Sequence, residues 1–194
     1  LAIIVPLREA KYFAPFKNAV AQNPNIVSVG GSMSHVGYNW GNATVASASQ
    51  KLETTLLSVG YNYLETMQIR LAQGRTFDEN LPSDLQNAVV INQKFANELG
   101  WAEPLGQTVT LDTLRYTVIG VVEDFHNESV WRPIAPCLFR MAKPENIRHL
   151  AVRANAENLH ATNEFLRETW RRVVPDLPYE GFYQEEVLAA AFEV

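Results

Sequence analysis

Apolar residues along this chain recur at two spacings, and each spacing predicts a different kind of element. Short runs rich in Val, Ile, Thr and aromatic residues, bounded by Gly, Pro, Asn or Asp, are typical of strands. Such runs predict strands at 1–5, 26–29, 43–48, 54–58, 88–91, 109–111, 116–122, 137–141, 149–153 and 179–182. The run at 116–122 is the strongest strand signal in the chain.

Apolar spacings of three and four residues predict two helices of substantial length, at 10–22 and 157–174. The second ends with Arg171 and Arg172, whose charges suit the negative end of the helix dipole, and Pro175 stops it. Shorter helices are expected at 61–67, between a capping Asn92 and a terminating Gly100, and from Gln184 onward, with a polar loop at 78–86.

The order of these elements predicts an α+β fold with a discontinuous organisation. A β-α-β unit at each end of the chain encloses a middle segment of short strands and turns. The two end units are expected to form the halves of a split, ferredoxin-like lobe. The predicted lobes are therefore 1–55 together with 133–194, and an inserted, strand-rich lobe at 56–132.

Composition and charge narrow the class of partner. Hydrophobic residues make up 47% of the chain and charged residues 19%, which is enough for a packed core without disulfides or metals. The net charge of -5 and the scattered Lys and Arg exclude the basic stripe of a nucleic-acid-binding protein. No stretch approaches the roughly 20 apolar residues of a membrane helix. The chain opens without Met inside a predicted strand, which indicates a domain excised from a longer protein.

The segment after the strand at 116–122 carries the strongest acid–base candidate. Asp124, His126 and Glu128 could hold a metal or a general base in a metal-dependent hydrolase. In an extended segment Asp124 and His126 share one face while Glu123 points the other way, so too few ligands gather locally. We therefore expect no catalytic, cofactor-binding or metal-binding residue, and a His126 that is hydrogen-bonded at the strand exit. The other histidines show no ligand spacing: His35, His149 and His160.

Other reactive patterns have simpler structural explanations. Gly30-Gly31-Ser32 lacks the lysine of a phosphate-binding loop and predicts a strand exit. Arg75 is expected to bond to a carboxylate or to carbonyl oxygens rather than to clamp an anion. The single cysteine, Cys137, excludes an intrachain disulfide and lies in an apolar run, which predicts a buried core residue.

Aromatic residues leave a second alternative open, a ligand-sensing module. Five of them could line a pocket, but they lie in separate elements, which favours core or interface positions. They are Tyr61, Tyr63, Trp101, Trp131 and Trp170.

Several motifs, in a fixed order, resemble those of a transporter family. The segments 61–71 and 74–77 resemble its "Y-x-Y-hydrophobic" and "G-R-x-F" signatures, and further matches lie at 88–93, 104–107, 116–126 and 134–136. In this combination the chain resembles the periplasmic core domain of MacB-like and FtsX-like ABC-transporter permeases over essentially its full length. Residues 188–194 lack a clear match.

The resemblance implies a soluble domain on the periplasmic side of the bacterial inner membrane, between the first two of four membrane helices. Its end-built lobe would be porter-like and its inserted lobe Sabre-like. ATP hydrolysis belongs to a cytoplasmic subunit or domain, so neither enzymatic activity nor a cofactor is expected here. The implied partners are a second permease copy, that ATPase, and a periplasmic adaptor or hydrolase activator. The isolated domain is expected to be a monomer or a weak dimer.

These implications predict a mechanical role. A domain tied at both ends to membrane helices moves with them, so it would relay ATP-driven motion to a periplasmic partner or substrate, in efflux or in mechanotransmission. Because both ends return to one membrane face, the two termini are expected to lie close together on one side of the fold.

Overall fold

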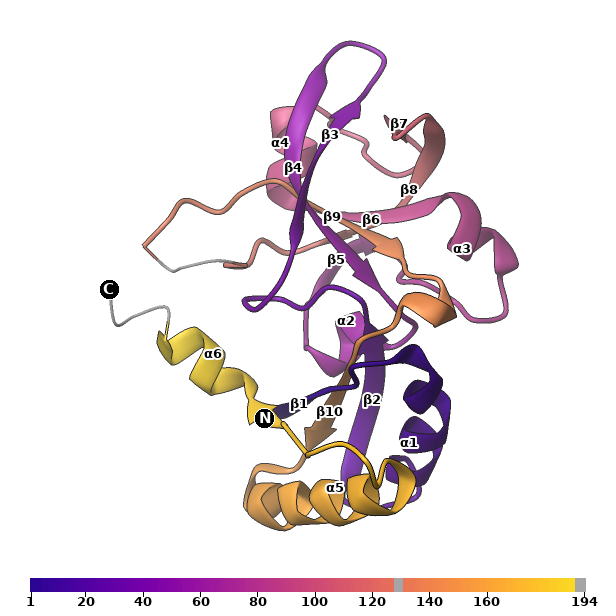
Figure 1. The fold of residues 1–194 in the computed structure, drawn as a ribbon. Helices are drawn as coiled ribbons and strands as arrows, with labels where there is room; N and C mark the ends of the chain where they lie inside the picture. Colours follow the sequence, from indigo (N-terminus) through magenta and orange to yellow (C-terminus); the bar gives the residue numbers. More distant parts are fainter. Residues whose placement is uncertain (128–130, 191–194) are drawn as a thin grey trace.

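The computed structural model describes residues 1–127 and 131–190. Within them, the strands join into one hydrogen-bonded sheet with a closed part and an open part (Figure 1). The strands are β1 (Ala2–Pro6), β2 (Ile26–Ser32), β3 (Gly41–Ala46), β4 (Lys51–Val59), β5 (Leu71–Gly74), β6 (Ala88–Asn92), β7 (Thr108–Leu111), β8 (Leu114–Val122), β9 (Cys137–Met141), β10 (His149–Ala154) and β11 (Phe182–Tyr183). The α-helices are α1 (Phe13–Val20), α2 (Tyr63–Thr66), α3 (Pro82–Asn87), α4 (Gln93–Glu98), α5 (Leu159–Val173) and α6 (Gln184–Ala190).

The open part, which we call the end-built sheet, is made from the two ends of the chain. Its strand order is β11-β1-β10-β2, and all neighbours are antiparallel. β1 and β2 therefore run in the same direction with β10 between them, and β10 and β11 run in the same direction with β1 between them. The two β-α-β units thus interleave within one sheet.

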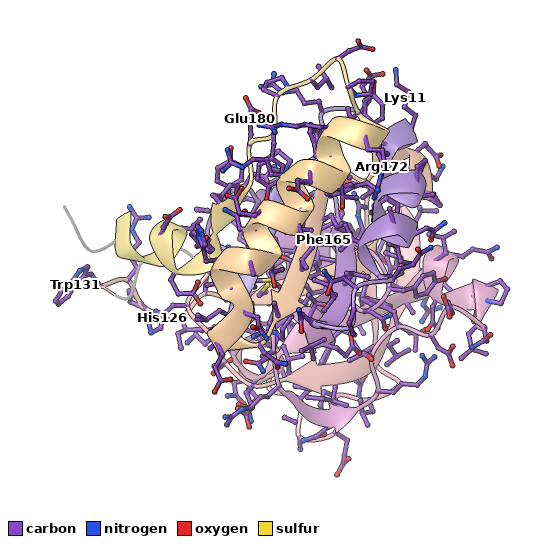
Figure 2. The ribbon with its side chains drawn as sticks, turned by 90° about the horizontal axis from the view of Figure 1, so that it is seen from below. Lys11, His126, Trp131, Phe165, Arg172 and Glu180 are labelled. Carbon is purple, nitrogen blue, oxygen red and sulfur yellow. The ribbon has the colours of Figure 1, made fainter. Side chains whose placement is uncertain are left out.

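Strand alternation divides the residues of the end-built sheet between two cores. Ile3, Val5 and Val152 lie on the face that packs against α1 and α5, where they join Phe16 and Trp170. Figure 2 shows α5 lying across this face. The Phe16 and Trp170 rings meet edge to face with centroids 5.2 Å apart, which is a favoured aromatic geometry.

The opposite face of the end-built sheet packs against α2. Ile4 and Ala151 point to this side and share a core with Tyr63 and Leu64 of α2. The backbone of α2 approaches β2 so closely that a Cβ added at Gly30 would lie 2.6 Å from the Cα of Tyr63.

The closed part is a circuit of strands that we call the closed sheet. β4, β3, β7, β8, β6 and β9 are hydrogen-bonded in that order, and β9 also pairs with β4 in parallel. Its core contains side chains from β3, β6, β7, β8, β9 and α4. Asn92 caps α4 as predicted, because its Oδ1 accepts a hydrogen bond of 3.0 Å from the backbone N–H of Phe95. Gly100 ends the helix with φ = 66°, which confirms its predicted place.

The segment 78–86 differs from its prediction as a polar loop, because it contains the helix α3. Pro82 stands at the first helical turn, where its missing N–H costs nothing. Asp84 is buried and pairs through both oxygens with Arg75, at 2.6 and 2.9 Å. The predicted carboxylate partner of Arg75 is thereby confirmed.

Other boundaries shift by a few residues. The predicted strand at 26–29 continues through Gly30-Gly31-Ser32, so these residues are part of β2 and not its exit. The helix predicted at 10–22 begins as a 3-10 turn at Ala10–Tyr12 before α1, and similar turns occur at Pro144–Asn146 and Ala156–Asn158. In residues 1–127 and 131–190, we find no helix with the length and apolar character needed to cross a membrane.

Candidate functional site at the junction of the chain ends

The two end segments of the described chain are neighbours in the end-built sheet. Ile3 pairs with Tyr183 and Ile4 with Phe182, and α6 starts directly after this pairing (Figure 1). The expectation of adjacent termini is met for β1 and β11, while residues 191–194 lie outside the described residues. α6 is therefore joined directly to the strand that pairs with β1.

The helix α6 packs against the turn between β2 and β3. The backbone N–H of His35 donates to the backbone and side-chain oxygens of Asn39, both at 2.7 Å, which closes the turn. Gly37 has φ = 77°, a conformation that favours glycine. A Cβ at Gly37 would lie 3.1 Å from the Cγ1 of Val187, so the turn and α6 are in close contact.

A closed set of hydrogen bonds, which we call the junction ring, links this turn to α2 and α6. The Val36 N–H donates to the Tyr63 hydroxyl at 3.1 Å, and that hydroxyl donates to His35 Nδ1 at 2.8 Å. His35 Nε2 donates to Gln184 Oε1 at 2.6 Å, and Gln184 Nε2 donates to the Val36 carbonyl at 3.2 Å. Because Gln184 Oε1 can only accept, Nε2 carries a proton, and in the neutral imidazole Nδ1 then accepts from the Tyr63 hydroxyl. All three side chains are buried.

Aromatic side chains and a second histidine enclose the junction ring. The His35 ring lies 5.9 Å from the ring of His149 and 6.3 Å from that of Phe182, centroid to centroid. Tyr38 packs over both Phe182 and His149, with centroids 5.1 and 5.8 Å away. The site therefore combines β10, β11, α2, α6 and the turn after β2.

Burial keeps this imidazole neutral. The pKa of His35 is lowered to about 4, because burial, the largest cause, and the nearby His149 together outweigh the opposing effect of the Gln184 hydrogen bond. Burial also lowers the pKa of His149. At neutral pH the imidazole of His35 in the junction ring and that of His149 beside it are therefore both uncharged.

We expect the free energy of unfolding to decrease in mild acid because of His35 in the junction ring. In the unfolded chain His35 is protonated below its pKa of 6.5. In the folded chain it is protonated only below about pH 4. The stabilisation is therefore complete above pH 6.5 and is lost as pH falls from 6.5 toward 4, at up to about 1.4 kcal/mol per pH unit. Urea unfolding at several pH values in this window measures how the free energy of unfolding depends on pH. This dependence should be weaker for His35→Gln than for the wild type. Equal slopes would show that His35 titrates normally in the folded chain.

The predicted acid–base residues lie at a different place and have other partners. Asp124 accepts a 2.7 Å hydrogen bond from the backbone N–H of Lys94, so it stabilises the start of α4. His126 is half-buried, and Glu128 lies outside the described residues. The neighbouring Asn127 is buried and contacts the turn, with its Oδ1 3.4 Å from the Gly37 N–H. Across residues 1–127 and 131–190, no three His, Cys, Asp or Glu side chains gather as metal ligands.

The other candidates occupy separate positions. Cys137 is buried, as predicted, and burial raises the pKa of its thiol, which disfavours a nucleophilic thiolate. Tyr63 and Trp170 belong to different cores, whereas Trp131 is 75% exposed and projects from the body in Figure 2. The five aromatic residues therefore do not line one pocket.

Sequence reasoning missed the residues of the junction ring. The pattern shows no ligand spacing for His35 and His149 and predicts for Gln184 only the start of a helix. Three strand pairings bring them together, and no local pattern in the sequence signals those pairings. Of the three side chains in the ring, Tyr63 alone carries a sequence signal, in the Y-x-Y segment and among the five aromatic residues.

Comparison with known sequences relates the chain to transporters. The family model described as MacB-like periplasmic core domain matches residues 3–168. Macrolide export ATP-binding/permease protein MacB 2 of Aeromonas hydrophila is 30% identical over 110 residues, which cover 51% of this chain and 16% of that protein. MacB 1 of the same organism is 32% identical over 123 residues, 59% of this chain and 19% of that protein. The chain thus spans less than a fifth of the length of these relatives.

Comparison with solved structures gives the same fold. The periplasmic region of MacB from Actinobacillus actinomycetemcomitans matches with a TM-score of 0.70 and 15% identity, covering 100% of this chain and 92% of that one. The extracellular domain of the ABC-type transporter YknZ from Gram-positive bacteria matches with a TM-score of 0.66 and 16% identity, covering 94% and 100%. At this level of identity the two likenesses show the fold. The chain belongs to the family of MacB-like periplasmic core domains.

Proposed function

We propose that this chain is the extracytoplasmic part of an ABC-transporter permease and relays ATP-driven motion of membrane helices to a periplasmic partner or substrate. The observation that carries this proposal is the junction of the chain ends. β1 and β11 are paired, and the junction ring connects α6 to α2 and to the turn after β2. A displacement of either end is thereby applied to the same sheet.

The relay depends on rigid packing between α6 and the rest of the domain. Gln184 is buried and bonded at both polar atoms of its amide, and Val187 lies against the turn at Gly37. Shifting α6 alone would leave buried polar groups unpaired, which costs about 1–3 kcal/mol for each group. The domain is therefore expected to move as a body when α6 moves.

We further propose a porter-like lobe built from both chain ends and a Sabre-like lobe inserted between them. The end-built sheet with α1 and α5 supports the first, and the separate core of the closed sheet supports the second. β3 pairs with β4 and β7, and Val45 joins the core of the closed sheet. We therefore place the start of the inserted lobe at β3, before residue 56, and its end after β9.

The proposed surroundings follow from the family and from the names of the relatives. The domain would lie on the periplasmic side of the bacterial inner membrane, next to a second permease copy. The names of the MacB relatives include an ATP-binding part, which supports a cytoplasmic ATPase as the source of motion. A periplasmic adaptor or hydrolase activator would receive the movement. The isolated chain would be a monomer or a weak dimer, because membrane helices would hold the pair together.

A flexible insertion after α6 tests the relay in the full-length transporter. A nitroxide at Ser49→Cys, in the exposed β3–β4 turn, reports the distance between the two copies once cysteines outside this chain are removed; Cys137 is buried and escapes labelling. We expect nucleotide trapping to change this distance in the parent transporter. Four Gly and Ser residues inserted after Ala190 should abolish most of the change and leave basal ATP hydrolysis intact.

The matched control carries the same insertion between Asp112 and Thr113, in the exposed β7–β8 turn. It should respond to nucleotide as the parent does. A distance change that survives the insertion after Ala190 would show that motion does not pass through α6. The absence of any nucleotide-dependent change in the parent would contradict the relay itself.

A further inference from the structure

A groove of about 430 Å³ lies where the β7–β8 turn and α3 meet the ends of β9 and β2. In Figure 1, α3 lies on the opposite side of the fold from α6. The volume is within the range of about 300–1,000 Å³ typical of small-molecule sites. The groove is formed by elements that are far apart in the sequence.

The groove gathers exposed apolar side chains from three separate elements. Met33 is 43% exposed, Leu85 of α3 is 38% exposed and Leu114 of β8 is 56% exposed. Tyr116 and Met141, both buried, complete the apolar surface beneath them. Large apolar side chains that remain exposed next to one another typically mark a binding surface.

The charge of the groove is opposite to that of the chain. The chain has 21 Asp and Glu against 16 Lys and Arg, yet no acidic side chain lines the groove, and two cations, Arg140 and Lys143, do. Arg140 is oriented by a 3.2 Å hydrogen bond from its Nε to Ser58 Oγ, and its Nη1 lies 4.0 Å from Asp112 Oδ2. Lys143 is exposed, and within residues 1–127 and 131–190 it makes no ion pair.

We propose that this groove binds a small carboxylate with an unbranched apolar chain. The apolar surface from Met33, Leu85 and Leu114 would cover the chain, and Lys143 with Arg140 would bind the head group. One of the two cations is already partly neutralised by Asp112, so the pair suits a single negative charge better than the two of a phosphate. This inference does not depend on the relay, since no lining residue of the groove belongs to α6 and binding requires no motion.

The methyl groups of the methionines can report ligand binding by NMR. The chain contains three, and two of them, Met33 and Met141, line the groove, whereas Met67, directly after α2, lines a different hollow. Related periplasmic regions have been crystallised on their own, so the 194-residue chain is suited to purification. The ¹³C-methyl spectrum of the chain, titrated with monomeric dodecanoate, should show saturable shifts of Met33 and Met141 and a constant Met67.

Two comparisons separate this site from general detergent binding. Dodecylammonium has the same apolar chain with the opposite charge, and it should shift neither methionine. Lys143→Glu should weaken dodecanoate binding by about tenfold, because it replaces a charge-assisted contact with repulsion. Lys51→Glu makes the same charge change at an exposed position of β4 outside the groove and should leave binding unchanged.

Each contrary result would overturn the proposal. Equal shifts of Met67, or equal shifts with dodecylammonium, would show adsorption without a defined site. Unchanged binding in Lys143→Glu would show that the charge of the groove has no role. No saturable shift of Met33 and Met141 would show that the groove does not bind this class of ligand. None of these outcomes bears on the distance measurement that tests the relay.

Discussion

Replacing Gly30 with alanine is expected to lower the free energy of unfolding by about 3 kcal/mol, a large change for the addition of one methyl group. The new Cβ would lie 2.6 Å from Tyr63 Cα, 2.8 Å from Asn62 O and 2.8 Å from Tyr63 N. All three atoms belong to the backbone of α2 or its cap, so no side chain can rotate away. Either α2 or β2 has to move. Urea unfolding followed by circular dichroism measures the change.

Gly41 provides the matched control because it also lies in a strand. A Cβ at Gly41 would have only Leu56 O within contact distance, at 3.8 Å. Gly41→Ala should therefore be neutral or slightly stabilising, since alanine loses less backbone entropy on folding than glycine. If Gly30→Ala were tolerated as well as Gly41→Ala, the close approach of α2 to the end-built sheet would be wrong.

Removing the Tyr63 hydroxyl should have the second large effect. Tyr63→Phe keeps the ring in the core and deletes the atom that connects the Val36 N–H with His35 Nδ1. Both groups would remain buried without this partner, and each unpaired group costs about 1–3 kcal/mol. We expect a loss of about 3 kcal/mol in the free energy of unfolding, measured by urea denaturation.

Tyr116→Phe is the control for this substitution. Tyr116 is also buried, and its hydroxyl has no hydrogen-bond partner among the described residues, so the change should stay within about 0.5 kcal/mol. A double-mutant cycle with Gln184→Ala adds a second check. The two losses should be less than additive, because either change opens the junction ring. Strict additivity would indicate two independent hydrogen bonds.

Elements with strong local patterns could be predicted from the sequence. The apolar run 116–122 became β8, the stripe of 157–174 became α5, and Asn92 caps α4 through its own side chain. Each of these depends on residues a few positions apart, where periodicity and capping chemistry operate. Burial of Cys137 followed from the apolar run around it.

The helix α3 shows where local patterns mislead. Its sequence is polar, and its one buried residue, Asp84, is a carboxylate that pairs with Arg75 from nine positions earlier. A polar segment with a proline is typical of a loop, but Pro82 is also suited to the first turn of a helix. The choice between the two depended on a tertiary ion pair.

The junction ring was beyond local prediction for a related reason. His35 and Gln184 are 149 positions apart, and Tyr63 comes from a third segment. None of the three has a charge or a spacing that marks it as a site residue. What joins them is the order of strands in the end-built sheet, which is a property of the whole chain.

A strand that enters the middle of a sheet late in synthesis delays the completion of that sheet. β10 bonds to β1 on one side and to β2 on the other, so Ile3 has no partner until Val152 has been made. Until then the inner edges of β1 and β2 are open to pairing with other chains. The closed sheet uses strands between residues 41 and 141, so we expect it to form first and the end-built sheet to close last. The newly made chain would therefore be most open to proteases and misassembly along its first 32 residues, where a holding chaperone would have its greatest effect.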